Sequence, residues 1–148
     1  MTPQQIELVQ ASFLRVQPIA EVAAELFYNR LFTLDPSLRP LFKGDMKQQG
    51  RMLMSVIGVA VNGLRNLDTL APVVRKMGAR HVGYGVKTEH YQTVGSALLW
   101  TLEQGLGSFF TPQVRDAWAA AYELLATVMQ MGAIEAGSAQ SAQGEVAA

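Results

Sequence analysis

The chain has 148 residues, of which 49% are hydrophobic, and its twelve basic side chains balance its twelve acidic ones. This is the length of one domain with a single core, and zero net charge gives nothing to attract nucleic acid or an anionic membrane. The absence of cysteine excludes disulfides, thiolate zinc sites and iron–sulfur clusters.

The N-terminal segment MTPQQIELVQ lacks the cationic and apolar regions of a signal peptide. The longest apolar stretch, at residues 52–61, is about half as long as a membrane span. We therefore expect a cytoplasmic protein that binds neither membrane nor nucleic acid.

Helix start signals recur along the chain. The dipeptide Thr-Pro, at residues 2–3 and 111–112, places a capping threonine before a proline at the first helical position. Asp-Pro at residues 35–36 and Asp68, with a proline one turn later, suggest two more starts. Breaks are expected at five places: near Pro18, at 43–45, near Asn66, at 83–85 and at 105–108.

Between these breaks apolar residues recur at helical spacing, from Ile6 in the first segment to Met129 in the last. No segment alternates apolar and polar residues long enough to predict a strand. The sequence thus predicts an all-α domain of about six to eight helices over residues 1–135. Residues 136–148 are small and polar, and we expect them to form a disordered tail.

One histidine lies on an apolar helix face. Leu70, Val74, Met77 and His81 are spaced four, three and four residues apart, which puts them on one side of a helix. A polar ring there needs a partner. Taken alone, the spacing favours a core histidine bonded to a backbone carbonyl or a water over a residue that binds a ligand.

Two other polar residues lie on apolar stripes. Gln49 precedes Leu53 and Val56 on one helix face, although a first-turn glutamine facing water explains the pattern equally well. Tyr28 lies within the apolar segment LFYNRLF, where its hydroxyl could bond a backbone carbonyl or face a pocket. We find no serine–histidine–acid set, no paired inward carboxylates and no phosphate loop, so no residue is assigned as catalytic.

Three stretches, in the right order, resemble one family. Residues 78–129, which begin GARHVGYGVKTEHY and end AAAYELLATVM, are similar to the corresponding half of neuroglobin-like and bacterial single-domain globins of the flavohaemoglobin type. Residues 26–42, LFYNRLFTLDPSLRPLF, resemble the second and third globin helices. Residues 49–67, QGRMLMSVIGVAVNGLRNL, resemble the distal helix. The resemblance covers residues 2–133 and implies a globin fold around one haem b.

The resemblance implies that His81 is the proximal ligand of the haem iron. Its other ring nitrogen would donate to a carbonyl one turn back, that of Met77. On the opposite side Gln49 takes the distal position, with Gln48 as a competitor one residue away. A distal glutamine departs from the histidine of neuroglobin-like proteins and leaves the sixth iron position open.

Further pocket residues follow from the same match. Tyr28 and Leu53 are expected in the distal pocket, and Arg80 beside a haem propionate or exposed to solvent. Tyr91 matches a tyrosine behind the proximal histidine, and its carboxylate partner in some bacterial globins falls here at Gly132 or Ala133. We expect His90 on the surface. The remaining expected porphyrin contacts are Phe42, Met52, Met77, Val86 and Val94.

Two hydrogen-bond donors in the distal pocket predict tight binding of dioxygen, with nitric oxide and carbon monoxide as other ligands. The alternatives are a nitric oxide dioxygenase served by a separate reductase and a haem-based gas or redox sensor. A haem-free interaction module and an electron-transfer cytochrome suit the residues less well. We expect a monomer or a weak homodimer.

Overall fold

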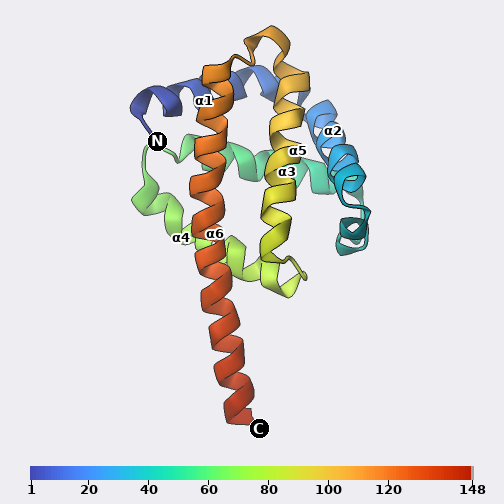
Figure 1. Ribbon diagram of the computed structural model, residues 1–148, viewed down its shortest axis with the longest axis vertical. Helices are drawn as coiled ribbons and strands as arrows, with labels where there is room; N and C mark the ends of the chain where they lie inside the picture. The colour runs from blue at the N-terminus through green and yellow to red at the C-terminus, as the bar shows by residue number, and fades with distance from the viewer. Residues whose placement is uncertain (148) are drawn as a thin grey trace.

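The chain folds into helices joined by short turns. The computed structural model describes the backbone of residues 1–147 and the side chains of residues 1–137. Over this range the chain forms six α-helices, three 3₁₀ turns and no strand (Figure 1), which confirms the all-α prediction. The elements are α1 (Pro3–Val16), η1 (Gln17–Ile19), α2 (Ala20–Leu34), η2 (Pro36–Leu41), α3 (Met46–Asn62), α4 (Leu67–Gly83), α5 (Thr88–Leu106), η3 (Gly107–Phe109) and α6 (Pro112–Ala147).

The predicted threonine caps start the first and last helices. Thr2 Oγ1 accepts from the Gln5 amide at 3.1 Å while Gln5 Oε1 accepts from the Thr2 amide at 2.9 Å, a complete capping box. Thr111 Oγ1 accepts from the Val114 amide at 3.2 Å at the start of α6. These side chains satisfy amides that would otherwise lack partners in the first turn.

The helix start predicted at Asp68 lies within two residues of the observed one, because α4 begins at Leu67 with Asn66 as its cap. The Asn66 carbonyl accepts from the Leu70 amide at 3.1 Å, so helical bonding begins earlier. Pro72 lies inside the helix, where its missing N–H removes one backbone hydrogen bond without ending the helix.

The main core lies between α1, α3, α5 and α6, around Phe13 and Trp118. Trp118 Nε1 donates to Ser12 Oγ at 2.8 Å, and Ser12 Oγ donates to the Leu8 carbonyl at 2.7 Å. A second cluster gathers on α2, η2 and α5; its buried members are Phe27, Tyr28, Leu31, Leu38 and Ala97.

The helices α3 and α4 are consecutive in the sequence but pack against different parts of the fold. α3 packs against α2 and α1, whereas α4 packs along α6, and α3 and α4 make almost no contact with each other. Both cross behind α5 and α6 in Figure 1, α3 higher in the view than α4. Neither of these two helices therefore covers the side of the other that faces it.

α6 continues as a helix to Ala147, and its last part runs beyond the other helices (Figure 1). The disordered tail expected over residues 136–148 stays a prediction. Residue 148 lies outside the described residues, and the domain boundary at 135 stays a prediction. No helix in the described part of the chain is both long and apolar enough to span a membrane.

Candidate functional site

His81 lies in the last turn of α4 with one ring nitrogen held by the helix itself. Its Nδ1 is 2.5 Å from the Met77 carbonyl oxygen, the partner expected from the sequence. Because a carbonyl only accepts, this bond requires the proton on Nδ1 and leaves the Nε2 lone pair free. The ring is half-buried, with the ring of Tyr84 edge-on at 6.1 Å between centroids.

The turn after His81 closes α4 and holds the histidine backbone. The Val86 amide donates to the His81 carbonyl at 3.0 Å, and the Gly85 amide donates to the Val82 carbonyl at 3.1 Å. Gly85 has a φ of 84°, a left-handed conformation that favours glycine. Val86 is half-buried beside this turn and Arg80 is exposed.

Tyr28 lies in α2 with its phenol buried, only 6% of the residue being exposed. Its ring packs edge-on against Phe42 at 5.3 Å between centroids and stacks on Phe32 at 6.0 Å. Burial raises the pKa of the Tyr28 phenol above its ordinary value of 10.0, while a hydrogen bond with the Gln49 side chain opposes the rise. Tyr28 is therefore a neutral hydrogen-bond donor at physiological pH.

The orientation of α3 about its own axis gives the two candidate distal residues, Gln48 and Gln49, different environments. Gly50 packs so closely against α2 that a Cβ added to it would lie 2.9 Å from the Ala24 Cβ. With Gly50 seated there, the half-buried Gln49 hydrogen-bonds Tyr28, whereas Gln48 is exposed. Tyr28 and Gln49 come from different helices and meet at one place.

α3 presents an exposed apolar face. Met52, Val56 and Val59, spaced four and three residues apart, are 55%, 38% and 56% exposed. Leu53, one turn after Gln49, is half-buried and packs in the second cluster with Phe42 and Val94. An apolar stripe that no other helix covers is a surface for an apolar ligand.

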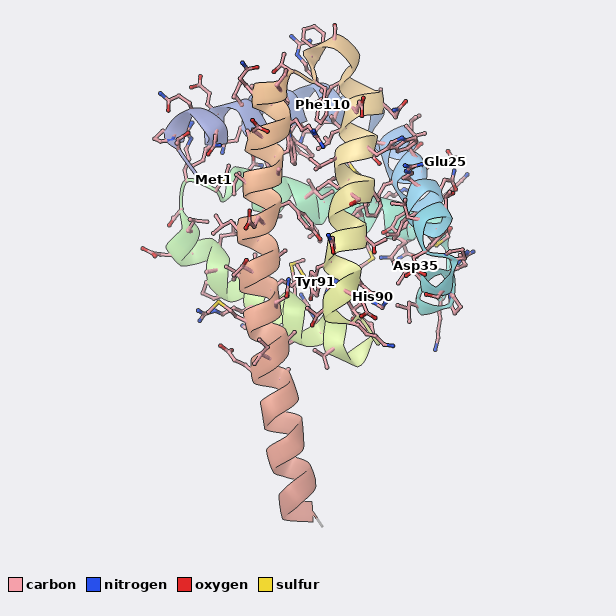
Figure 2. All side chains as sticks on the ribbon, viewed as in Figure 1. Met1, Glu25, Asp35, His90, Tyr91 and Phe110 are labelled. Atoms are coloured by element: carbon pink, nitrogen blue, oxygen red, sulfur yellow. The ribbon has the colours of Figure 1, made fainter. Side chains whose placement is uncertain are left out.

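Tyr91 lies in the first turn of α5 (Figure 2) and is 8% exposed, and its hydroxyl has no hydrogen-bond partner among the described residues. Its carbonyl accepts from the Tyr122 hydroxyl at 2.5 Å. Gly132, one of the two expected partner positions, lies instead against the Arg75 carbonyl of α4. Ala133 is half-buried and has no carboxylate to offer.

His90 has a local role that its sequence position does not reveal. Its Nδ1 accepts from the Lys87 amide at 2.9 Å and so caps the start of α5. The residue is half-buried rather than fully on the surface, and it lies on α5 near Tyr91 (Figure 2). This side chain therefore stabilises a helix end.

The residues around α3 and α4 fit a haem. His81 offers a free Nε2 to iron, and the uncovered apolar face of α3 would lie on one side of a flat apolar ring. Tyr28 and Gln49 would supply polar groups for a ligand of that haem. One imidazole, an apolar face and two neutral donors form a donor set suited to a haem that binds a small neutral gas.

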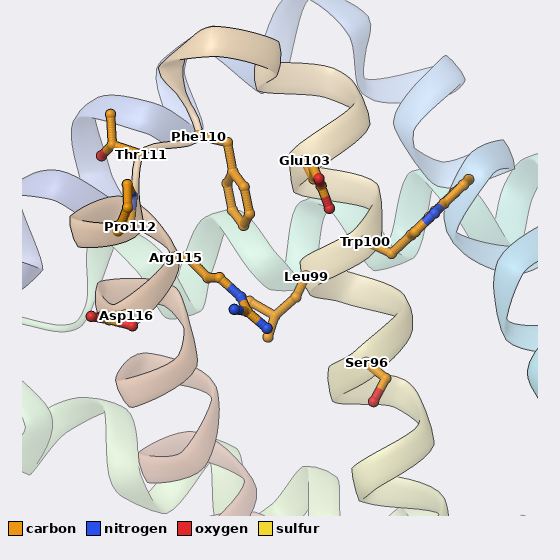
Figure 3. A pocket seen from close by; sticks show the side chains of 9 residues that line it. All are labelled: Ser96, Leu99, Trp100, Glu103, Phe110, Thr111, Pro112, Arg115 and Asp116. Atoms are coloured by element: carbon orange, nitrogen blue, oxygen red, sulfur yellow. The ribbon is translucent and has the colours of Figure 1, made fainter.

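A cavity of about 570 Å³ lies elsewhere, between the end of α5 and the start of α6 (Figure 3). Arg115 extends from α6 into this space towards Leu99 of α5. A second cavity, of about 20 Å³, lies behind Leu53 among apolar side chains that include Ile57 and Trp118. The sequence reasoning singled out neither, because each forms only where distant helices meet.

Comparison with known proteins supports this interpretation. Residues 25–129 match the family model described as Globin. A flavohemoprotein of Bordetella parapertussis is 33% identical over 132 residues, which cover 87% of this chain and 33% of that protein. A flavohemoprotein of Vibrio cholerae is 30% identical over 131 residues, which cover 86% and 33%. The chain spans about a third of the length of these curated relatives.

Two solved structures share the fold. One is an engineered carbene transferase from Rhodothermus marinus, described as a candidate nitric oxide dioxygenase, with a TM-score of 0.86 and 25% identity, covering 95% of this chain and 99% of that one. The other is a bacterial globin from Campylobacter jejuni, with a TM-score of 0.80 and 27% identity, covering 90% and 97%.

Proposed function

The chain belongs to the globin family, and from this premise we propose that it is a haem b protein that binds dioxygen at an iron held by His81. The observation that carries the proposal is the bond from His81 Nδ1 to the Met77 carbonyl at 2.5 Å. It fixes the tautomer that leaves Nε2 free for a metal. The bound haem supplies an iron with one open position for a diatomic gas.

Tyr28 and Gln49 determine how tightly such a gas is held. The phenol is neutral because burial raises its pKa, so it can donate a hydrogen bond. The Gln49 amide is a second donor beside it. Each donor is worth about 1–2 kcal/mol towards a polarised ligand, so together they raise affinity roughly 30- to 1000-fold. We therefore propose slow dissociation of dioxygen, which suits neither storage nor delivery.

Nitric oxide dioxygenation is the second candidate function. Its support is that the relatives include flavohemoproteins and a candidate nitric oxide dioxygenase. On this proposal a reductase returns the iron to its ferrous state. Consumption of nitric oxide with formation of nitrate, in the presence of dioxygen and a reductant, would support it. A protein that binds dioxygen but forms no nitrate would contradict it.

The visible spectra of the ferric, ferrous and oxygenated protein test the primary proposal. We expect a Soret band, a five-coordinate ferrous form and an oxygenated form that persists. His81→Ala should lose haem, whereas His90→Ala, which removes only a helix cap, should retain it. If His81→Ala binds haem with unaltered spectra, the assignment of the iron ligand is wrong.

A further inference from the structure

The backbones of α4 and α6 touch at two glycines. A Cβ added to Gly78 of α4 would lie 1.8 Å from the Met129 carbonyl oxygen of α6. A Cβ added to Gly132 of α6 would lie 2.0 Å from the Arg75 carbonyl oxygen of α4. The contact is reciprocal, because each helix contributes one glycine and one carbonyl. No other residue type fits at either position without moving a helix.

The contact between α4 and α6 lies close in sequence to His81, the proposed iron ligand. Gly78 follows Met77, whose carbonyl holds the His81 ring, and precedes His81 by three residues. α6 is the helix against which α4 packs, since α4 makes almost no contact with α3. The place of His81 relative to the rest of the fold therefore depends on how closely α4 approaches α6.

We propose that Gly78 and Gly132 are positioning residues for His81, a proposal that rests on the proposed haem function. By letting the two backbones touch, they set the height and tilt of α4 and so the distance at which Nε2 meets the iron. An alanine at residue 78 must increase the 1.8 Å separation to at least 3.0 Å, and a backbone carbonyl cannot swing aside as a side chain can. The shift would be transmitted along α4, a stiff helix, to the imidazole.

The test compares alanine substitutions in the full-length, haem-loaded chain. Gly78→Ala and Gly132→Ala should both shift the iron–histidine stretching band in the resonance Raman spectrum of the ferrous protein. Both should also speed haem transfer to an acceptor apoprotein by about 10- to 100-fold, the usual effect of disturbing the support of a metal ligand. Gly83→Ala is the matched control, because it lies in the same helix and its added Cβ meets nothing within 4 Å.

A second control separates positioning from general loss of stability. Gly95 of α5 packs against the Tyr122 ring of α6, which a Cβ would approach to 2.7 Å, and the three atoms nearest to that Cβ all belong to this ring. Gly95→Ala should lower stability and leave the iron–histidine band in place. In a His81→Gly background loaded with free imidazole, Gly78→Ala should no longer move the band, because the ligand is detached from α4.

Several outcomes would overturn the proposal. It fails if the iron–histidine band of Gly78→Ala and Gly132→Ala has the same frequency as that of Gly83→Ala. It also fails if Gly95→Ala shifts this band as much as the two α4–α6 variants do. It also fails if neither α4–α6 variant folds while both controls do, since the contact would then be needed for folding alone. A wild-type chain that binds no haem would instead refute the proposed function, so the two failures are distinguishable.

Discussion

Tyr28→Phe tests the distal donors most directly. Phenylalanine keeps the ring, so the contacts with Phe42 at 5.3 Å and Phe32 at 6.0 Å remain. Only the hydroxyl is lost, and with it the hydrogen bond to Gln49. We expect the substituted protein to fold and to bind haem as the wild type does.

The expected magnitude follows from one hydrogen bond. Removing a donor worth about 1–2 kcal/mol should raise the dioxygen dissociation rate by about 5- to 30-fold. Stopped-flow replacement of dioxygen by carbon monoxide measures this rate. Carbon monoxide is less polarised than dioxygen, so its own dissociation rate should change much less, which provides a control within the same protein.

Two results would refute the reasoning. If Tyr28→Phe leaves the dioxygen rate unchanged, the phenol does not reach the ligand and its bond with Gln49 is only structural. If the carbon monoxide rate rises as much as the dioxygen rate, the substitution has opened the pocket rather than removed a donor. The double variant with Gln49→Leu extends the test. Independent donors predict a product of the single effects, roughly 30- to 1000-fold, and a departure from that product measures the coupling between two side chains in contact.

Three further predictions follow from the described contacts. Gln49→Leu should raise the dioxygen dissociation rate by about 5- to 30-fold, while the exposed neighbour variant Gln48→Leu leaves it unchanged in the same stopped-flow assay. Ser12→Ala leaves the buried Trp118 N–H without its acceptor and should lower the free energy of unfolding in urea by about 1–3 kcal/mol; an unchanged midpoint would show that another acceptor replaces it. Burial raises the pKa of Tyr122 well above its ordinary value of 10.0, so the unfolded chain loses this phenolic proton first as pH rises. Stability measured in urea should therefore be level below pH 10.0 and fall above it, with Tyr122→Phe reducing the slope by up to about 1.4 kcal/mol per pH unit; equal slopes in both proteins would contradict the assignment.

Features that depend on neighbours within one or two turns could be predicted from the sequence alone. Thr2 and Gln5 form their capping box because both partners lie in the same turn. His81 bonds the Met77 carbonyl because a helix brings residues four apart onto one face. The all-α architecture followed in the same way from apolar spacing, a property that each helix carries alone.

Features that need two distant segments became clear only from the packing of the helices. The sequence pattern favours Gln49 over Gln48 through its stripe with Leu53, but only the close approach of Gly50 to α2 shows Gln49 beside Tyr28. The contacts of Gly78 with the Met129 carbonyl and of Gly132 with the Arg75 carbonyl likewise leave no local signal. In the sequence alone, a glycine inside a helix indicates only a less stable helix. The spacing of residues along one helix shows on which face of that helix a residue lies. The distance to a neighbouring helix depends on the side chains of both helices.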